Sequence, residues 1–125
     1  MSTSSPSPLH VALVDDDPDV RLAMQALLRS FGYRVSLYGD ARRLLAAGVA
    51  GVDCIVSDVQ MPGMDGLDLL ARLRASPAAP PCILITAYPD PQVEARARRE
   101  GAWCFLSKPV DDEHLARCIR QASAS

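Results

Sequence analysis

The sequence has no long hydrophobic run, no strong net charge and no export signal. No apolar stretch approaches the roughly 20 residues that span a membrane, so we expect no membrane partner. The N-terminus lacks a basic segment followed by an apolar one, which argues against a secretory signal. The formal net charge is −2, whereas domains that bind nucleic acid electrostatically are normally basic, so we expect no direct nucleic-acid binding.

Paired cysteine motifs are also missing, because none of the four cysteines forms a Cys-x-x-Cys pair. Cys54, Cys82 and Cys104 fall in predicted buried strands, where a thiol packs as a small apolar group. We therefore predict structural cysteines rather than metal ligands or disulfides. Free thiols are typical of reducing compartments, so the predicted location is the cytoplasm.

The chain of 125 residues suits one domain, which can bury roughly two-thirds of its unfolded surface without a disulfide or metal. Residues 1–8 are rich in Ser, Thr and Pro, which predicts a disordered tail. The folded domain is predicted over residues 9–122. Residues 123–125 are predicted to be a C-terminal tail or the start of a linker.

Between residues 9 and 122, short apolar runs alternate with segments of helical periodicity. The predicted strands are 9–14, 33–38, 52–58, 82–86 and 103–107, and the predicted helices begin near residues 18, 41, 66, 91 and 112. This alternation is typical of an α/β domain, a doubly wound parallel sheet with helices on both faces. The second strand alternates apolar and polar residues, which favours an edge position with one wetter face.

Reactive side chains stand where the predicted strands end. Asp15 and Asp16 follow the first strand, Asp58 ends the third, Thr86 ends the fourth, and Lys108 follows the fifth. Ligands of open α/β sheets bind outside the carboxyl ends of the strands. We therefore expect these five side chains to meet at one edge of the sheet.

This set of side chains suits a divalent cation and a phosphoryl group. Mg²⁺ prefers hard oxygen ligands, which Asp16, Asp58 and the backbone carbonyl of Gln60 can supply, while Asp15 can hold a coordinated water. Clustered carboxylates repel one another, so at least one of them should titrate above its ordinary pKa. Asp58 can also attack phosphorus to form an aspartyl phosphate. Lys108 and a metal would neutralise the charge on the phosphoryl oxygens.

Simpler interpretations exist for the same residues. Asp15 and Asp16 could be charges that favour a helix N-terminus, although Asp17, which directly precedes a proline, fits that role better. Lys108 could be an ordinary exposed lysine, but its position between an apolar strand and a proline favours the site. Trp103 is predicted to serve packing rather than function.

Four short motifs occur in one order along the chain. They are Val-Asp-Asp-Asp-Pro at 14–18, Asp58 followed by Met-Pro-Gly-Met-Asp-Gly at 61–66, Ile-Thr-Ala at 85–87, and Lys-Pro at 108–109. Together they make residues 9–122 resemble the receiver domain of two-component response regulators, more closely that of FixJ-type transcriptional regulators. The resemblance implies a flavodoxin-like (βα)5 fold with strand order 2-1-3-4-5.

The resemblance also implies a function. Asp58 would accept a phosphoryl group from a sensor histidine kinase, in a reaction that needs Mg²⁺ or Mn²⁺ held by Asp15, Asp16 and Asp58. Lys108 would contact the phosphoryl oxygens, and the domain would be a self-catalysed phosphoacceptor rather than an enzyme.

Further expectations follow from the same likeness. The Lys108–Pro109 peptide bond would be cis, which proline makes accessible. Thr86 and Phe105 would form a switch pair. The fourth helix, fifth strand and fifth helix would form the output face, a candidate homodimer interface on phosphorylation, which would regulate transcription.

The sequence departs from the family pattern at Val110, where Phe is common after Lys-Pro. Gln60 and Tyr88 occupy positions that resemble those tuning the lifetime of the aspartyl phosphate. We hypothesise that Tyr88 slows hydrolysis by shielding the phosphoryl group from water. The chain is either a single-domain regulator or the receiver of a DNA-binding protein, and the FixJ-type likeness favours the latter.

Two other functions fit the predicted fold less well. A metal-dependent aspartyl-phosphate phosphohydrolase would usually carry an acid two residues after its nucleophile, where this chain has Gln60. A flavin or nucleotide-binding module would need a Gly- and Ser/Thr-rich loop after the first strand. Asp15, Asp16 and Asp17 stand there instead and would repel phosphate unless a metal intervened.

Overall fold

The computed structural model describes residues 8–124, so most of the predicted N-terminal tail (residues 1–7) and Ser125 lie outside the described residues. The strands are β1 (His10–Val14), β2 (Arg34–Tyr38), β3 (Cys54–Asp58), β4 (Cys82–Thr86) and β5 (Cys104–Ser107). The helices are α1 (Pro18–Ser30), α2 (Ala41–Ala47), α3 (Gly66–Arg74), α4 (Pro91–Arg99) and α5 (Asp112–Ala124). Every predicted element is present. Four strands begin one or two residues later than predicted, and α5 continues two residues past residue 122, the predicted end of the folded domain.

The five strands form one parallel sheet in the order β2-β1-β3-β4-β5. This order confirms the predicted flavodoxin-like fold. The chain leaves β1 for the edge strand β2 and then crosses back to β3, so the strand order reverses between β1 and β3. Such a reversal opens a crevice at the carboxyl ends of the two strands, because their connections leave in opposite directions. Within residues 8–124, no helix is long and apolar enough to cross a membrane.

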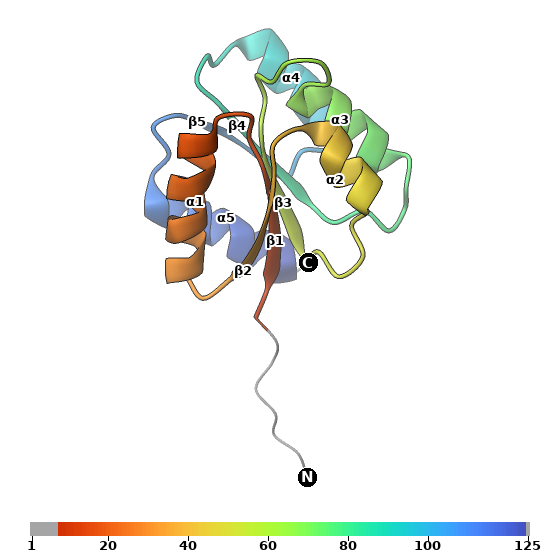
Figure 1. Cartoon of the computed structure of the whole chain (residues 1–125). Coiled ribbons are helices and arrows are strands. Elements are labelled where there is room, and N and C mark those ends of the chain that lie inside the picture. Colours follow the sequence, from red (N-terminus) through yellow and green to blue (C-terminus); the bar gives the residue numbers. More distant parts are fainter. Residues whose placement is uncertain (1–7, 125) are drawn as a thin grey trace.

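The helices cover both faces of the sheet (Figure 1). On one face, α1 and α5 pack against a cluster that includes Leu28 and Leu115. On the other face, α2, α3 and α4 enclose a second cluster. Two of the three interior strands, β3 and β4, are buried along their whole length, as expected for strands covered on both sides.

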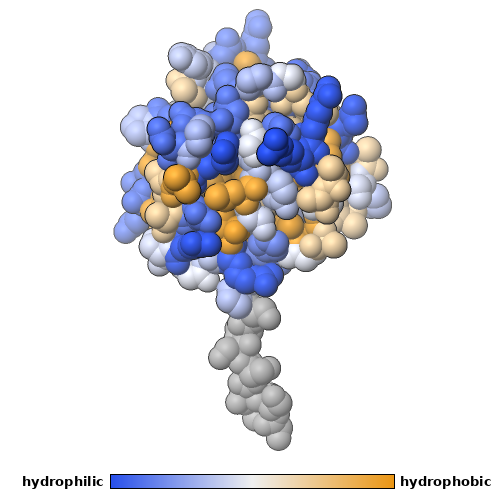
Figure 2. All heavy atoms as spheres, viewed as in Figure 1, coloured by the Kyte–Doolittle hydropathy of each residue, from blue (hydrophilic) through white to orange (hydrophobic). Residues whose placement is uncertain are grey.

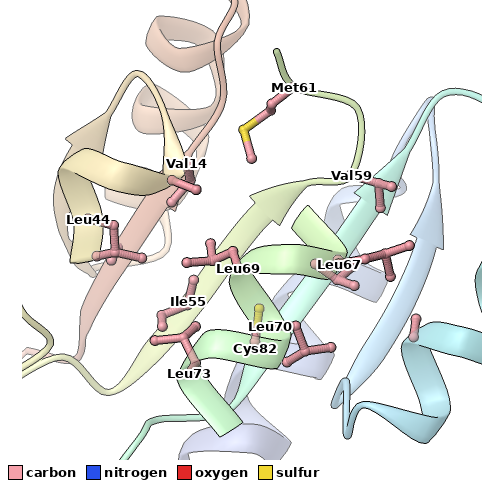
Figure 3. Close-up of a cluster of buried hydrophobic side chains, with 14 residues drawn as sticks. Val14, Leu44, Ile55, Val59, Met61, Leu67, Leu69, Leu70, Leu73 and Cys82 are labelled. Atoms are coloured by element: carbon pink, nitrogen blue, oxygen red, sulfur yellow. The ribbon is translucent and has the colours of Figure 1, made fainter. Parts of the chain in front are cut away.

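The second cluster is built largely around α3. Four leucines of α3 point at the sheet and at α2, where they contact buried side chains of β1, β3 and β4 (Figure 3). The leucines are Leu67, Leu69, Leu70 and Leu73. The helix begins with a capping box, in which Asp65 and Asp68 each accept the other's backbone N–H. This packing fixes α3 against the end of β3.

The edge strands are less buried than their sequences suggest. In β2 the residues from Val35 to Tyr38 are all half-buried, so the predicted alternation between a dry and a wet face is absent. In β5 Cys104 is half-buried, whereas Cys54, Cys82 and Cys118 are buried, and all four are free thiols. Burial raises the pKa of the Cys54 thiol to about 12, which supports a packing role.

Trp103 does not have the packing role predicted for it. It precedes the edge strand β5 and is 41% exposed, because no further strand within residues 8–124 pairs with β5. On the face that Figure 2 shows, apolar side chains form small groups over α1 and β2, separated by polar ones. Leu22 of α1 and Tyr88, before α4, are the other large apolar side chains that are exposed within the described residues.

Candidate functional site

Three carboxylates meet where β1 and β3 end. Asp15 and Asp16 directly follow β1, and Asp58 is the last residue of β3, the strand that pairs with β1. One oxygen from each carboxylate lies within 4.8 Å of the others. Asp15 is 4% exposed and Asp58 is 9% exposed, whereas Asp16 is exposed. The sheet therefore assembles the predicted acidic cluster from residues more than 40 positions apart in the sequence.

The Lys108 side chain reaches this cluster from the loop after β5, the strand at the opposite edge of the sheet from β2. Its Nζ atom lies 3.3 Å from Asp58 Oδ2 and 3.8 Å from Asp15 Oδ2. The Lys108 backbone N–H donates to the Thr86 carbonyl oxygen over 2.8 Å, which anchors the loop after β5 to the end of β4. The Lys108–Pro109 peptide bond is cis. The structure thus brings together the four predicted ionic groups Asp15, Asp16, Asp58 and Lys108.

The charges at this edge do not balance. Burial is the main factor that raises the pKa of Asp15 above its usual value, and repulsion from Asp58 adds to it. The backbone N–H of Asp17, 2.9 Å from Asp15 Oδ1, and the nearby Lys108 act in the opposite direction. A raised carboxyl pKa was expected from repulsion, but loss of water around Asp15 is the larger cause.

The cluster has the chemistry of a divalent cation site. Three carboxylates supply hard oxygen ligands, and a single ammonium leaves an excess of negative charge that a cation would neutralise. Gln60 lies beside Asp58, since its backbone N–H donates to Asp58 Oδ1 over 3.4 Å. The role of the Gln60 backbone carbonyl as a further ligand of the cation stays a prediction.

Thr86 ends the strand that pairs with β3, but its hydroxyl binds Gln60 and not the acids. It is fully buried at the end of β4, and its hydroxyl donates to Gln60 Oε1 over 2.9 Å. The same hydroxyl oxygen accepts the backbone N–H of Tyr88 over 3.0 Å. Phe105 is half-buried against the cluster under α2, α3 and α4. The switch role of Thr86 and Phe105 stays a prediction.

A cavity of about 260 Å³ opens beside the acids, between α1 and the loop that begins with Lys108. Its wall is mainly apolar, with Asp15, Asp58 and Lys108 at one end and Val110 among the apolar residues. A bulkier residue at Val110 would take up part of this space. The departure from the family pattern noted at this position therefore coincides with an opening next to the acids.

The contacts of two residues near the site were not predicted from the sequence. Arg21 of α1 donates from Nη1 to the Asp15 carbonyl oxygen over 2.7 Å and so fixes the backbone of the acidic loop. Gly66 is pressed against β3, and a Cβ at this position would collide with the Asp58 carbonyl oxygen. The Arg21 contact could have been suspected, because Arg21 lies one turn beyond the helix cap Asp17.

A comparison with known protein families decides what this arrangement represents. The model of the response regulator receiver domain matches residues 11–120, most of the chain. The chain belongs to the response regulator receiver domain family. The residues matched include the acidic cluster, Thr86 and Lys108.

The relatives of this receiver domain include transcriptional regulators. It is 38% identical over 115 residues to transcriptional regulatory protein FixJ of Bradyrhizobium diazoefficiens, covering 90% of this chain and 56% of FixJ. It is 41% identical over 116 residues to C4-dicarboxylate transport transcriptional regulatory protein DctD of Pseudomonas aeruginosa, covering 90% of this chain and 25% of DctD. The chain thus spans only about half of FixJ and a quarter of DctD.

Solved structures show the same fold. The crystal structure of FixJ-N matches with a TM-score of 0.86 at 30% identity, covering 95% of this receiver domain and 96% of that chain. Chemotaxis protein CheY4 of Vibrio cholerae matches with a TM-score of 0.83 at 28% identity, covering 93% and 99% of the two chains. The FixJ-type assignment made from the sequence motifs is confirmed.

Proposed function

We propose that this receiver domain accepts a phosphoryl group from a sensor histidine kinase on Asp58, in a reaction that requires Mg²⁺ or Mn²⁺. The observation that carries this proposal is the approach of Lys108 Nζ to within 3.3 Å of Asp58 Oδ2, beside two further carboxylates. A buried carboxylate with an ammonium and a cation-binding cluster around it is suited to hold a charged phosphoryl group.

In the proposed transfer, an Asp58 carboxylate oxygen attacks the phosphorus atom carried by the kinase's histidine. The new O–P bond forms as the P–N bond breaks, and the imidazole nitrogen leaves with the bonding electron pair and takes up a proton. Asp15, Asp16 and Asp58 would hold the cation, which neutralises charge on the phosphoryl oxygens when bound. Lys108 balances the charge of another phosphoryl oxygen, because its ammonium already lies at the acceptor.

The geometry of the cavity supports a direction of approach for the donor. Asp58 and Lys108 both line the cavity between α1 and the loop after β5. On the other side, Gly66 and the first turn of α3 press against the Asp58 backbone. The kinase is therefore proposed to approach over α1 and the loop after β5.

The proposed output is a change in the α4-β5-α5 face, which would regulate transcription in a larger protein and could form a homodimer interface. Thr86 and Phe105 are the proposed switch pair. The packing of α4 is compatible with such a change, because Ala97 is its only fully buried residue. An aspartyl-phosphate phosphohydrolase is disfavoured, because the Gln60 amide stands where an acid/base would be needed and accepts the Thr86 hydroxyl.

The proposal predicts that Asp58 is the acceptor. Incubation with Mg²⁺ and acetyl phosphate should add one phosphoryl group to the wild-type chain, measured by intact mass spectrometry. Asp58→Asn should remove the label, because an amide oxygen is a poor nucleophile. Chelation of the cation by EDTA should also remove it.

A matched control tests whether the label depends on Asp58 in particular or decreases on the loss of any carboxylate. Asp19→Asn removes an exposed acid in the first turn of α1 and should leave the label at the wild-type level. Labelling of Asp58→Asn to the wild-type extent would move the acceptor elsewhere and contradict the proposal.

A further inference from the structure

Gln60 makes a contact that the proposed transfer does not use. The residue lies in the loop after β3, two positions beyond Asp58, and its backbone N–H donates to Asp58 Oδ1 over 3.4 Å. Its side chain turns to the neighbouring strand, where Oε1 accepts the Thr86 hydroxyl over 2.9 Å. Gln60 therefore links the acceptor carboxylate to the buried hydroxyl at the end of β4.

The Thr86 hydroxyl both donates and accepts a hydrogen bond in this arrangement. A threonine hydroxyl has a single proton to donate, and here that proton goes to Gln60 Oε1. The hydroxyl oxygen at the same time accepts the backbone N–H of Tyr88 over 3.0 Å. Because Thr86 has no exposed surface, water cannot readily replace either partner.

A phosphoryl group on Asp58 would compete for the same proton. Thr86 can donate to a phosphoryl oxygen only after its hydrogen bond to Gln60 breaks, since one O–H cannot serve both acceptors well. A turn of the Thr86 side chain that moves its oxygen toward Asp58 would also release the Tyr88 N–H, which lies in the loop leading to α4. The two hydrogen bonds of Thr86 therefore oppose the movement that the switch requires.

We propose that Gln60 is a positioning residue that holds Thr86 in its unphosphorylated arrangement through Oε1. This inference rests on the proposed function, because it assumes that Asp58 is the phosphoryl acceptor. Gln60 sets how readily the domain switches: the phosphoryl group must displace the Gln60 amide before Thr86 can turn toward it. Loss of the amide acceptor shifts the resting equilibrium toward the switched arrangement.

The test compares Gln60→Met, which keeps the length of the side chain but removes the acceptor, with the wild-type chain. Net hydrogen-bond energies correspond to about a 2- to 10-fold change in an equilibrium. In the absence of a phosphodonor, the Thr86 methyl resonance of Gln60→Met should move toward its position in the phosphorylated wild-type protein. The initial rate of Asp58 labelling by acetyl phosphate should rise by about the same factor, because more molecules start in the competent arrangement.

Two further variants test whether the changes come from the lost acceptor oxygen of Gln60 and not from a substitution as such. Gln60→Glu keeps an oxygen acceptor and should return the Thr86 resonance of the resting protein to near its wild-type position. Gln121→Met removes an exposed amide from α5, far along the sequence, and should change neither readout. Gln60 is exposed, so we expect all three variants to fold, which the amide resonances of β3 and β4 would verify.

The outcomes separate this inference from the function on which it rests. If Gln60→Met leaves both the Thr86 resonance and the labelling rate unchanged while the wild type is labelled at Asp58, Gln60 does not hold Thr86. If the wild type is not labelled at Asp58 at all, the proposed function fails instead. In that case, a change of the Thr86 resonance in Gln60→Met that is absent in Gln60→Glu would still identify the Gln60 contact as the restraint on the hydroxyl.

Discussion

Asp15 combines two roles that oppose each other. Its side chain is almost fully buried and lies in the cluster with Asp58, so its negative charge is poorly solvated and repelled. The same charge would favour a bound cation. A residue of this kind lowers the stability of the metal-free domain and raises its affinity for the ion.

The stability of the metal-free domain should therefore depend on the charge of Asp15. Because the folded state raises the pKa of Asp15 above the ordinary 3.8, folding favours the protonated form. The stabilising effect is complete below pH 3.8 and is lost as the pH rises through the higher folded-state pKa. Asp15→Asn should raise the melting temperature at pH 7 in EDTA, and the gain should shrink as the pH falls toward 3.8.

Thermal unfolding followed by circular dichroism at several pH values would measure this effect. Asp19→Asn, at an exposed position, is the control and should show no such pattern. An Asp15→Asn variant that is less stable than the wild type at pH 7 in EDTA would mean that the contact with Lys108 outweighs burial and repulsion.

At the scale of elements, α3 rests directly on the end of β3. Gly66 is the first residue of α3, and its Cα approaches the Asp58 carbonyl so closely that no side chain fits between them. Gly66→Ala should destabilise the domain by about 1–3 kcal/mol, because either α3 or the end of β3 has to shift. Urea unfolding monitored by circular dichroism would measure the loss.

Gly39→Ala provides the matched comparison. A Cβ at Gly39 would meet only the end of the Arg21 side chain, at 3.3 Å, and a small shift of that side chain would disturb only its hydrogen bond to the Asp15 carbonyl oxygen. We expect a smaller loss of stability than for Gly66→Ala. Equal losses in the two variants would show that the contact between α3 and β3 is not tight.

The sequence predicted the elements well where local chemistry specifies them. Asp17 accepts the N–H groups of Asp19 and Val20 as a helix cap, as its position before a proline indicated. The starts of β1, β2, β3 and β5 were placed one or two residues too early, because an apolar or aromatic residue lies one or two positions before each of these strands. The exposure of Trp103 was not predicted, although the implied strand order already placed the fifth strand at an edge, because a large aromatic side chain is usually assigned to the core.

The same distinction holds for the site. Residues at the carboxyl ends of parallel strands must share one edge, so Asp15, Asp58 and Lys108 could be grouped from the sequence. The hydrogen bond between Thr86 and Gln60 could not, because it depends on the paths of two loops relative to each other. Side-chain contacts between loops are set by the packing of the whole sheet.

For the whole molecule, cation binding and folding should be coupled. An ion that binds only the folded cluster stabilises it in proportion to the logarithm of its concentration. At a Mg²⁺ concentration 100-fold above its dissociation constant, the melting temperature should rise by about 10 °C. Scanning calorimetry with and without Mg²⁺ would measure the shift.

Asp16→Asn tests the origin of this effect, because Asp16 is exposed and its loss should leave the fold intact. The variant should retain the melting temperature of the metal-free wild type and lose most of the shift with Mg²⁺. The Asp19→Asn control should keep the full shift. A shift that survives in Asp16→Asn would place the cation outside the cluster.

The contact between Gly66 and the Asp58 carbonyl has a mechanical consequence. With a helix seated on its backbone, Asp58 would have no room to recoil toward α3 if a phosphoryl group were attached to it. Under the proposed function, the added volume would instead be taken up by the cavity beside Asp58 and by the loop after β5, which bears Lys108. A rigid support on one side would thus direct the proposed motion away from α3.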